Sequence, residues 1–317
     1  MFFKHGRLAV GYLMLRRSLL YLSQQAGLRR WMENSPVSRK LTSRFVAGRT
    51  LDDGIRVLEK LFAENILGTL DHLGENVKSL EDAVRSRNSY LAALSQIEHA
   101  ALPATVSIKL TQFGLDFSER ACHANVRALV ERARAIGSRV EIDMESSAYT
   151  DRTLRLVVEL HSDFRGHVRA VIQAYLHRSE ADIRMLCARG IPVRLCKGAY
   201  HEPPSVAFAL KSDVDANYVK LMKLLLEEGA EPAIAGHDAN ILREVVRYTK
   251  EQNIAPDRYE FQMLYGIRRD LQRQLIARGF RLRLYVPYGD AWYPYFMRRL
   301  AERPANVLFL AKNLLRK

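Results

Sequence analysis

The sequence predicts an α/β fold built as a distorted (βα)8 TIM barrel, and three observations lead to that prediction. Short apolar runs alternate with longer amphipathic ones from residue 66 onward, the alternation repeats about eight times within ~250 residues, and no run opens on a nucleotide-binding glycine motif. A doubly wound sheet is the competing fold, but its GxGxxG and GxxxxGK[ST] motifs are both missing. The strand-like runs cover residues 66–74, 105–114, 139–146, 168–175, 191–200, 232–238, 259–266 and 282–289.

The helix-like runs lie between these strands and carry apolar residues three and four positions apart. They include 118–137, 150–163, 179–189, 203–229, 240–252 and 267–279. Ahead of the barrel, 8–34 and 50–63 are expected to be helical and to be joined by a turn around Pro36. We therefore expect an N-terminal basic helical segment over residues 1–63 and a barrel domain over residues 64–317, with a final helix over the barrel mouth.

The net charge of +14 lies mostly at the two ends of the chain. Residues 1–50 hold ten Lys/Arg against one acidic residue, Glu33, and residues 312–317 hold three against none, so the 261 residues between them carry only about +2. A basic amphipathic terminus fits an anionic membrane surface, and a soluble basic helical lid is the alternative. The middle of the chain has no zinc pattern, RNP-like strand or repeated basic face, so we expect no nucleic-acid partner.

The lengths of the apolar runs and the number of cysteines indicate where in the cell the protein is located. No run reaches the ~18 apolar residues of a membrane span, because Arg16 and Arg17 interrupt the longest N-terminal one, and that run lacks a small-residue cleavage site. The three cysteines form neither a metal-binding spacing nor an even disulfide framework. We expect a cytoplasmic protein without a metal, placed peripherally at the inner face of the cytoplasmic membrane.

Polar residues occur in the middle or near the carboxyl ends of the strand-like runs. A charged residue in a strand that is buried on both faces is costly unless it pairs or faces a ligand, and barrel active sites are built at these strand ends. A single Lys–Asp pair could be structural, whereas polar groups on five strands at one mouth favour a site. The residues are Lys109, Glu141, Asp143, Glu145, Gln173, Arg194, Lys197, His237 and Asp238.

The last regular element carries two adjacent arginines, Arg298 and Arg299. Together with Tyr295 and Glu302 they fall at i, i+3, i+4 and i+7, which places all four on one helix face. Pro294 and Pro304 limit this helix to about three turns. A guanidinium matches a carboxylate bidentately, so the pair predicts a clamp for a small carboxylate; complementing the helix dipole is the alternative role.

The chemistry is narrowed by the motifs that are missing. The chain has no dominant carboxylate pair, no HExxH or Cys/His cluster and no GxSxG elbow. Among the candidate site residues the cations Lys109, Arg194, Lys197, Arg298 and Arg299 dominate, which suits an anionic substrate and a phosphate-bearing cofactor. Nearby Tyr200, Leu264, Tyr285 and Tyr288 suit a flat ring and a small aliphatic body.

The motifs together resemble those of the monofunctional bacterial proline dehydrogenases, over essentially residues 40–310. They are RFVAGRTLDDGI, DHLGE, SIKLTQFGLDF, VEIDMES, VIQAYLHR, VRLCKGAY, EFQMLYG and YVPYGDAWYPYFMRRLAERPAN. The resemblance implies an FAD-dependent distorted barrel that oxidises L-proline to Δ1-pyrroline-5-carboxylate by hydride transfer. It further implies that a membrane quinone reoxidises the flavin and that a separate pyrroline-5-carboxylate dehydrogenase consumes the product.

The resemblance also implies roles for individual residues. Lys109, Arg298 and Arg299 would bind the proline carboxylate, with Asp143 holding Lys109 and Tyr285 walling the ring. Leu264 would form part of an apolar cover, and Glu75 matches a gating position. The implied FAD contacts are Gln173, Arg194, Lys197, Gly198, Ala199, Tyr200, His237 and Glu302, with Arg194 near the flavin N5. His201 and Gly236 depart from the family pattern in the region implied to bind the ribityl and adenosine portions.

Two other classes of function stay open at this stage. One is a different small-acid barrel enzyme, and the other is a nonenzymatic basic module that binds surfaces. A flavin spectrum that proline bleaches separates the first from a proline dehydrogenase, and strong salt-dependent binding without flavin is required of the second.

Overall fold

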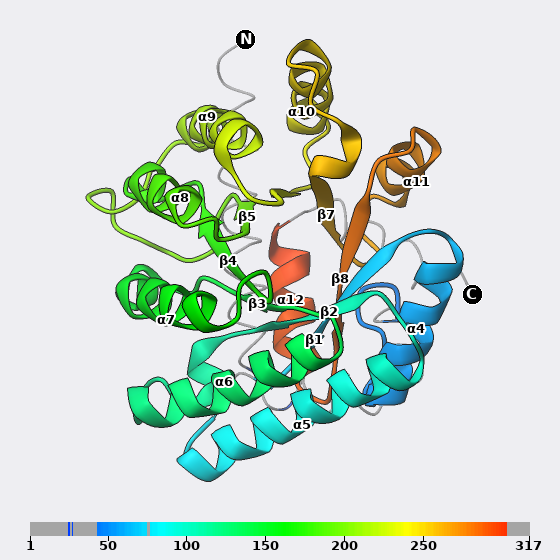
Figure 1. Ribbon diagram of the computed structural model, residues 1–317, viewed down its shortest axis with the longest axis vertical. Helices are drawn as coiled ribbons and strands as arrows, with labels where there is room; N and C mark the ends of the chain where they lie inside the picture. The colour runs from blue at the N-terminus through cyan, green and yellow to red at the C-terminus, as the bar shows by residue number, and fades with distance from the viewer. Residues whose placement is uncertain (1–24, 26, 28–42, 75–76, 303–317) are drawn as a thin grey trace.

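Eight parallel strands close into a barrel in which β8 pairs back to β1 (Figure 1). The structure is a computed structural model that describes residues 25, 27, 43–74 and 77–302, with side chains up to Met297. Each strand coincides with a predicted run, with β2 beginning one residue early at Ala104, so the predicted (βα)8 fold is confirmed. The strands are β1 Leu67–His72, β2 Ala104–Ile108, β3 Val140–Ile142, β4 Val168–Gln173, β5 Val193–Cys196, β6 Ala233–Ala235, β7 Glu260–Leu264 and β8 Leu282–Tyr288.

Helices surround this barrel, and their sequences mark where several of them begin. Thr50 and Asp53 cap the start of α4 reciprocally, while Ser79 and Ser118 accept hydrogen bonds from backbone amides at the starts of α5 and α6. Each such cap contributes about 1 kcal/mol. The helices are α4 Leu51–Ala63, α5 Leu80–His99, α6 Glu119–Ala135, α7 Thr150–Asp163, α8 Ser179–Ala188, α9 Lys211–Glu228, α10 Ala239–Glu251, α11 Arg269–Ala277 and α12 Trp292–Glu302, with short 3-10 turns η1 Leu110–Phe113, η2 Ser147–Tyr149 and η3 Pro256–Arg258.

The predicted helix over 203–229 is wrong in its first part, because α9 begins only at Lys211. Pro203 and Pro204 supply no backbone N–H, and a residue before proline is pushed toward an extended conformation. Residues 197–210 instead form a segment that follows β5 and is fastened by an antiparallel bridge between Leu176 and Ala207.

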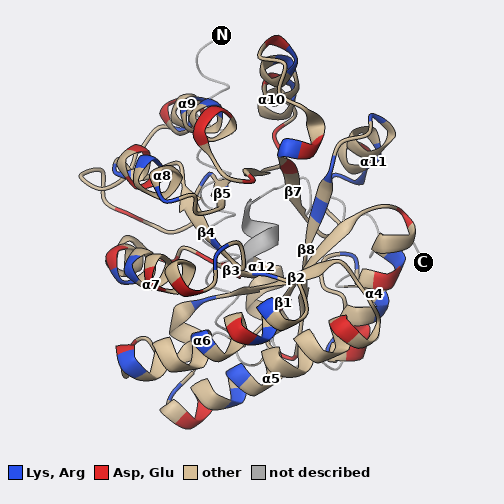
Figure 2. Cartoon of the chain, viewed as in Figure 1, with Lys and Arg blue, Asp and Glu red and all other residues tan. Residues whose placement is uncertain are grey.

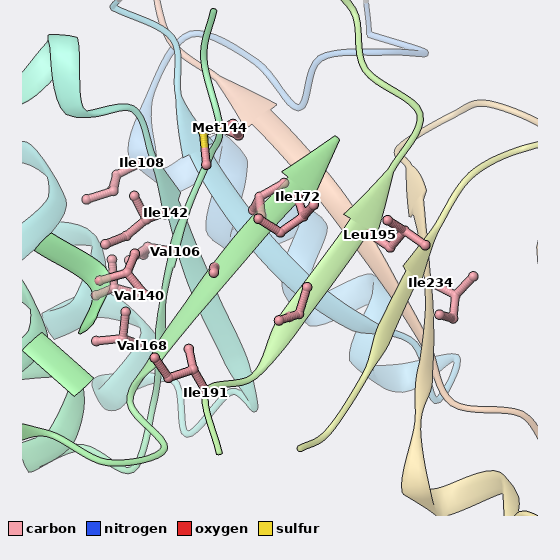
Figure 3. Close-up of a cluster of buried hydrophobic side chains, with 14 of the residues drawn as sticks. Val106, Ile108, Val140, Ile142, Met144, Val168, Ile172, Ile191, Leu195 and Ile234 are labelled. Atoms are coloured by element: carbon pink, nitrogen blue, oxygen red, sulfur yellow. The ribbon is translucent and has the colours of Figure 1, made fainter. Parts of the chain in front are cut away.

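Alternating side chains give the barrel an apolar outer layer and a polar interior. On β4, Val168, Ala170 and Ile172 belong to the core cluster, whereas Arg169 reaches Glu260 on β7. The apolar side chains of β2 to β6 form one continuous group (Figure 3). Each fully buried aliphatic side chain of this kind contributes about 1.5–3 kcal/mol.

Ion pairs cross the interior of the barrel. Arg169 Nη1 lies 2.5 Å from Glu260 Oε1 and 3.3 Å from Glu141 Oε1, and Arg283 Nε lies 3.1 Å from Glu260 Oε1. Burial opposes the charge of Glu260, but Arg283 and Arg169 outweigh it and hold the pKa of this carboxyl well below its usual range. Charged residues also cover the outer faces of the helices in mixed signs (Figure 2).

The final helix α12 lies at the centre of the strand ring in Figure 1. It is 11 residues long, in agreement with the predicted three turns. Its buried residues Trp292, Tyr293 and Phe296 cluster with Leu73, which follows β1, and Ile267, which follows β7. The helix therefore covers the end of the barrel at which the strands finish, as the fold prediction required.

The expected N-terminal segment is described only in its last part. The α4 residues Ile55, Leu58 and Leu61 join the core cluster of the barrel. Residues 1–24, 26 and 28–42 lie outside the described part of the chain, so the boundary between 63 and 64 stays a prediction. Among the described helices, none combines the length and apolar character needed to cross a membrane.

Candidate active site

A lysine lies between two carboxylates where β1, β2 and β3 end. Lys109 directly follows β2, and its Nζ is 3.6 Å from Asp71 Oδ1 and 3.5 Å from Asp143 Oδ2. The lysine side chain is only 14% exposed. Two flanking carboxylates keep such a buried ammonium charged, so it presents a fixed cation.

Asp143 is the most heavily bonded of these groups. Tyr285 donates its hydroxyl to Asp143 Oδ2 at 2.8 Å, and Ser107 donates to Oδ1 at 2.8 Å. Burial raises the pKa of Asp143, but Arg194, Lys109 and the two hydroxyls outweigh burial and lower it. Burial followed by the nearby Asp143 charge raises the pKa of Tyr285 well above its usual value. Asp143 is therefore ionised and Tyr285 neutral over a wide pH range.

Arg194 on β5 is a second fixed cation. Its Nη1 donates to Glu141 Oε2 at 2.9 Å, its Nη2 pairs with Asp143, and its Cζ lies 5.4 Å from the centroid of the Tyr285 ring. Burial opposes its charge, but Asp143 and Glu141 outweigh burial and raise its pKa. The structure thus brings the predicted residues Lys109, Asp143, Arg194 and Tyr285 into one connected group.

Apart from Glu302 on α12, the residues predicted to bind a cofactor lie on or directly after β4, β5 and β6. Gln173 Nε2 donates to the backbone oxygen of Glu145 at 2.8 Å. Lys197 Nζ lies 2.5 Å from Asp215 Oδ1 and 3.1 Å from Asp238 Oδ2, so two carboxylates hold this ammonium.

His237 and Leu264, predicted for different roles, are direct neighbours. The Leu264 backbone N–H donates to His237 Nε2 at 2.8 Å, which requires that this ring nitrogen carries no proton. The contact joins the end of β7 to the residues that follow β6.

Gly198 lies near the start of the segment after β5 and has a backbone conformation that favours glycine. Its φ is +110°, and an added Cβ would meet the Tyr175 ring at 2.2 Å. Ala199 and Tyr200 follow it, and Tyr200 is 40% exposed. Without a side chain at this position, the backbone packs directly against the Tyr175 ring.

The predicted carboxylate clamp is not described at the level of side chains. Arg298, Arg299 and Glu302 belong to α12 by their backbone, and their side chains lie outside the described part. Glu75 also lies outside the described residues. The roles of these four residues stay predictions.

Three residues of the site were not predicted from the sequence. Asp71 on β1 and Ser107 on β2 contact the Lys109–Asp143 pair, and Gln262 on β7 contacts Arg194. The same signal, a polar residue inside an apolar strand, could have found all three. Asp71 is the first residue of the DHLGE motif, four positions before Glu75, to which the family resemblance assigns the gating role.

A closed parallel barrel with a charged group at the carboxyl ends of its strands defines a (βα)8-barrel enzyme. The profile of the proline dehydrogenase family matches residues 55–312. Proline dehydrogenase 1 of Bacillus subtilis is 38% identical over 304 residues, which cover 96% of this chain and 100% of that protein. Proline dehydrogenase of Deinococcus radiodurans is 38% identical over 280 residues, 87% of this chain and 90% of that protein.

A solved structure is similar as well. Proline utilization A (PutA) from Bdellovibrio bacteriovorus, inactivated by N-propargylglycine, aligns with a TM-score of 0.79 at 28% identity over 88% of this chain. The alignment covers 34% of that PutA chain, so this chain spans about a third of its length. The chain belongs to the proline dehydrogenase family. It is an oxidoreductase of proline catabolism.

Proposed function

We propose that this protein oxidises L-proline to Δ1-pyrroline-5-carboxylate with FAD as the hydride acceptor. The observation that carries the proposal is the connected group of Lys109, Asp143, Arg194 and Tyr285 at the barrel mouth of a member of this family. A cation for a carboxylate and a second cation for a flavin are what this reaction needs from the protein.

The residues present fit FAD. The cations Arg194 and Lys197 and the amide of Gln173 lie on or directly after neighbouring strands. Gly198 lets the segment after β5 pack closely against Tyr175. The cofactor, when bound, accepts a hydride from C5 of proline. The residues that would hold it are Gln173, Arg194, Lys197, Gly198, Ala199, Tyr200, His237 and Glu302, with Arg194 near the flavin N5.

The protein would act mainly by positioning. Lys109, Arg298 and Arg299 would bind the substrate carboxylate, and Tyr285 and Leu264 would cover the ring, so that C5 is oriented without a covalent intermediate. Glu75 would gate the site. Because Arg194 and Lys109 lower the pKa of Asp143, its carboxylate is a weak base and would act as a positioning group, so no dedicated base is proposed.

The electrons would pass to a membrane quinone, with the basic N-terminal segment as the docking element. Removing residues 1–30 is expected to reduce cosedimentation with anionic vesicles; unchanged cosedimentation would rule this segment out. A separate pyrroline-5-carboxylate dehydrogenase would then oxidise the product.

Product analysis tests the reaction. The FAD-loaded protein, incubated with L-proline and a soluble quinone, is expected to form a product two hydrogens lighter than proline, and Lys109→Met is expected to raise KM strongly. An FAD-loaded protein that leaves proline unchanged would contradict the proposal.

A further inference from the structure

Glu141 is the hub of the polar barrel interior. It lies in the middle of β3 and is 0% exposed. Its Oε1 accepts from Thr105 Oγ1 at 3.2 Å and from Arg169 Nη1 at 3.3 Å, and its Oε2 accepts from Arg194 Nη1 at 2.9 Å. Glu141 therefore connects Arg169, which lies inside the barrel, to Arg194, the cation nearer the mouth.

Arg194 is held by two carboxylates that engage different nitrogens. Arg194 Nη1 donates to Glu141 and also to Gln262 Oε1 at 3.3 Å. Arg194 Nη2 donates to Asp143 and also to Ser107 Oγ at 3.2 Å. Because a guanidinium is a rigid planar fork, partners on both terminal nitrogens fix its plane as well as its position.

The charges of the interior balance. Three arginines, Arg169, Arg194 and Arg283, pair with three carboxylates, Glu141, Asp143 and Glu260. Removing the charge of Glu141 would leave Arg194 with Asp143 alone and the interior with one surplus positive charge. In a dry interior such a charge acts over longer distances than in water.

We propose that Glu141, which is fully buried and bonded to Arg194, is a positioning residue that fixes Arg194 and thereby sets the electron affinity of the flavin. The proposal rests on the proposed function, in which Arg194 is a flavin contact. A carboxylate behind Arg194 offsets part of its positive charge, and that offset disfavours the added electrons of the reduced flavin.

The reduction potential of the bound flavin tests this inference. Glu141→Gln keeps the size and one acceptor atom but loses the charge, so it is expected to favour reduction about tenfold, equal to about +30 mV for a two-electron couple. The potential is measured on the holoenzyme by equilibration with a reference dye. Glu141→Asp, which keeps the charge, is expected to restore most of the parent potential.

Glu260→Gln is the matched control. It makes the same charge change in the same interior, but Glu260 pairs with Arg169 and Arg283 and not directly with Arg194. Its shift is expected to be clearly smaller, because Glu260 reaches Arg194 only indirectly, through residues such as Gln262. Equal shifts in the two variants, or no shift in Glu141→Gln, would overturn the inference.

Two further outcomes are distinguishable. Should the glutamine variants not fold, Glu141→Ser is compared with Glu260→Ser, because serine also removes the charge; the larger positive shift is again expected at Glu141, and equal shifts would overturn the inference. A parent protein that binds no flavin overturns the proposed function and this inference together. A parent flavin that proline bleaches, with an unshifted Glu141→Gln variant, overturns the inference alone.

Discussion

Asp143 shows how single residues at the mouth are fixed in one ionisation state. Its carboxylate is bonded by Ser107 and Tyr285 and lies beside Lys109 and Arg194. Burial alone would raise the pKa of this aspartate, but these contacts lower it, so Asp143 is ionised at neutral pH. The same contacts orient the two cations that the proposed reaction uses.

A pH dependence follows from these two ionisation states. The lowered pKa of Asp143 keeps it ionised, and the raised pKa of Tyr285 keeps it neutral, between neutral and alkaline pH. The titrating group in this range should be the proline amine, which must be neutral before hydride leaves. We expect kcat/KM for proline to rise with pH from neutral to alkaline values. A flat or falling profile would contradict this.

At the scale of residues, the sequence indicated which side chains lie together where a polar residue interrupts an apolar strand. Lys109, Asp143 and Arg194 stand out in this way, and they lie together in the structure. Asp71 and Ser107 were missed because proximity across three strands depends on barrel register, which pairs β1 with β2 and β2 with β3. A single sequence does not display that register.

At the scale of elements, the segment after β5 depends on Gly198. We expect Gly198→Ala to weaken FAD binding by at least about tenfold, because its Cβ would meet the Tyr175 ring at 2.2 Å and overpacking typically costs 1–3 kcal/mol. The dissociation constant of FAD measures this effect.

Gly190→Ala is the matched control for that substitution. Gly190 also has a positive φ, +68°, but an added Cβ meets nothing within 4 Å. It should lower stability through backbone strain and leave FAD affinity unchanged. An equal loss of FAD affinity in both variants would show that backbone strain, and not the clash with Tyr175, controls binding.

The α12 helix carries the predicted carboxylate clamp. Arg298→Met and Arg299→Met should each raise KM for proline about 100-fold, since a hydrogen bond to a charged group contributes about 1.5–3 kcal/mol. Steady-state kinetics and the flavin content of the purified variants are measured together. Loss of FAD from both variants would make these residues structural or cofactor ligands.

Elements were predicted best where a local pattern was strong. All eight strands and the three turns of α12 were predicted, while the start of α9 was not. The amphipathic pattern there continues through Pro203 and Pro204, and the extended segment is held by a contact with Leu176 that has no local signal.

At the scale of the whole molecule, ion pairs make barrel stability depend on pH. The folded-state pKa values of Glu141 and Glu260 are lowered, because neighbouring arginines outweigh burial. Their contribution is therefore complete above the unfolded-state pKa of about 4.3 and is lost as pH falls through the folded-state values.

We expect the melting temperature to be nearly constant from about pH 7 to 5 and to fall steadily below about pH 4.5. Glu260→Gln should melt lower at neutral pH and show a shallower acid slope. Thermal unfolding followed by circular dichroism across this range tests the expectation. Parallel slopes in the parent and the variant would mean that other carboxylates govern acid unfolding.

The most direct measurement of the central claim is an anaerobic titration of the purified protein with L-proline while the flavin absorbance is recorded. The account predicts a yellow protein whose flavin bands bleach in proportion to proline, with one reduced flavin per chain at the end point. A colourless protein that gains no bleachable flavin on addition of FAD, or bound flavin that proline leaves oxidised, would contradict it.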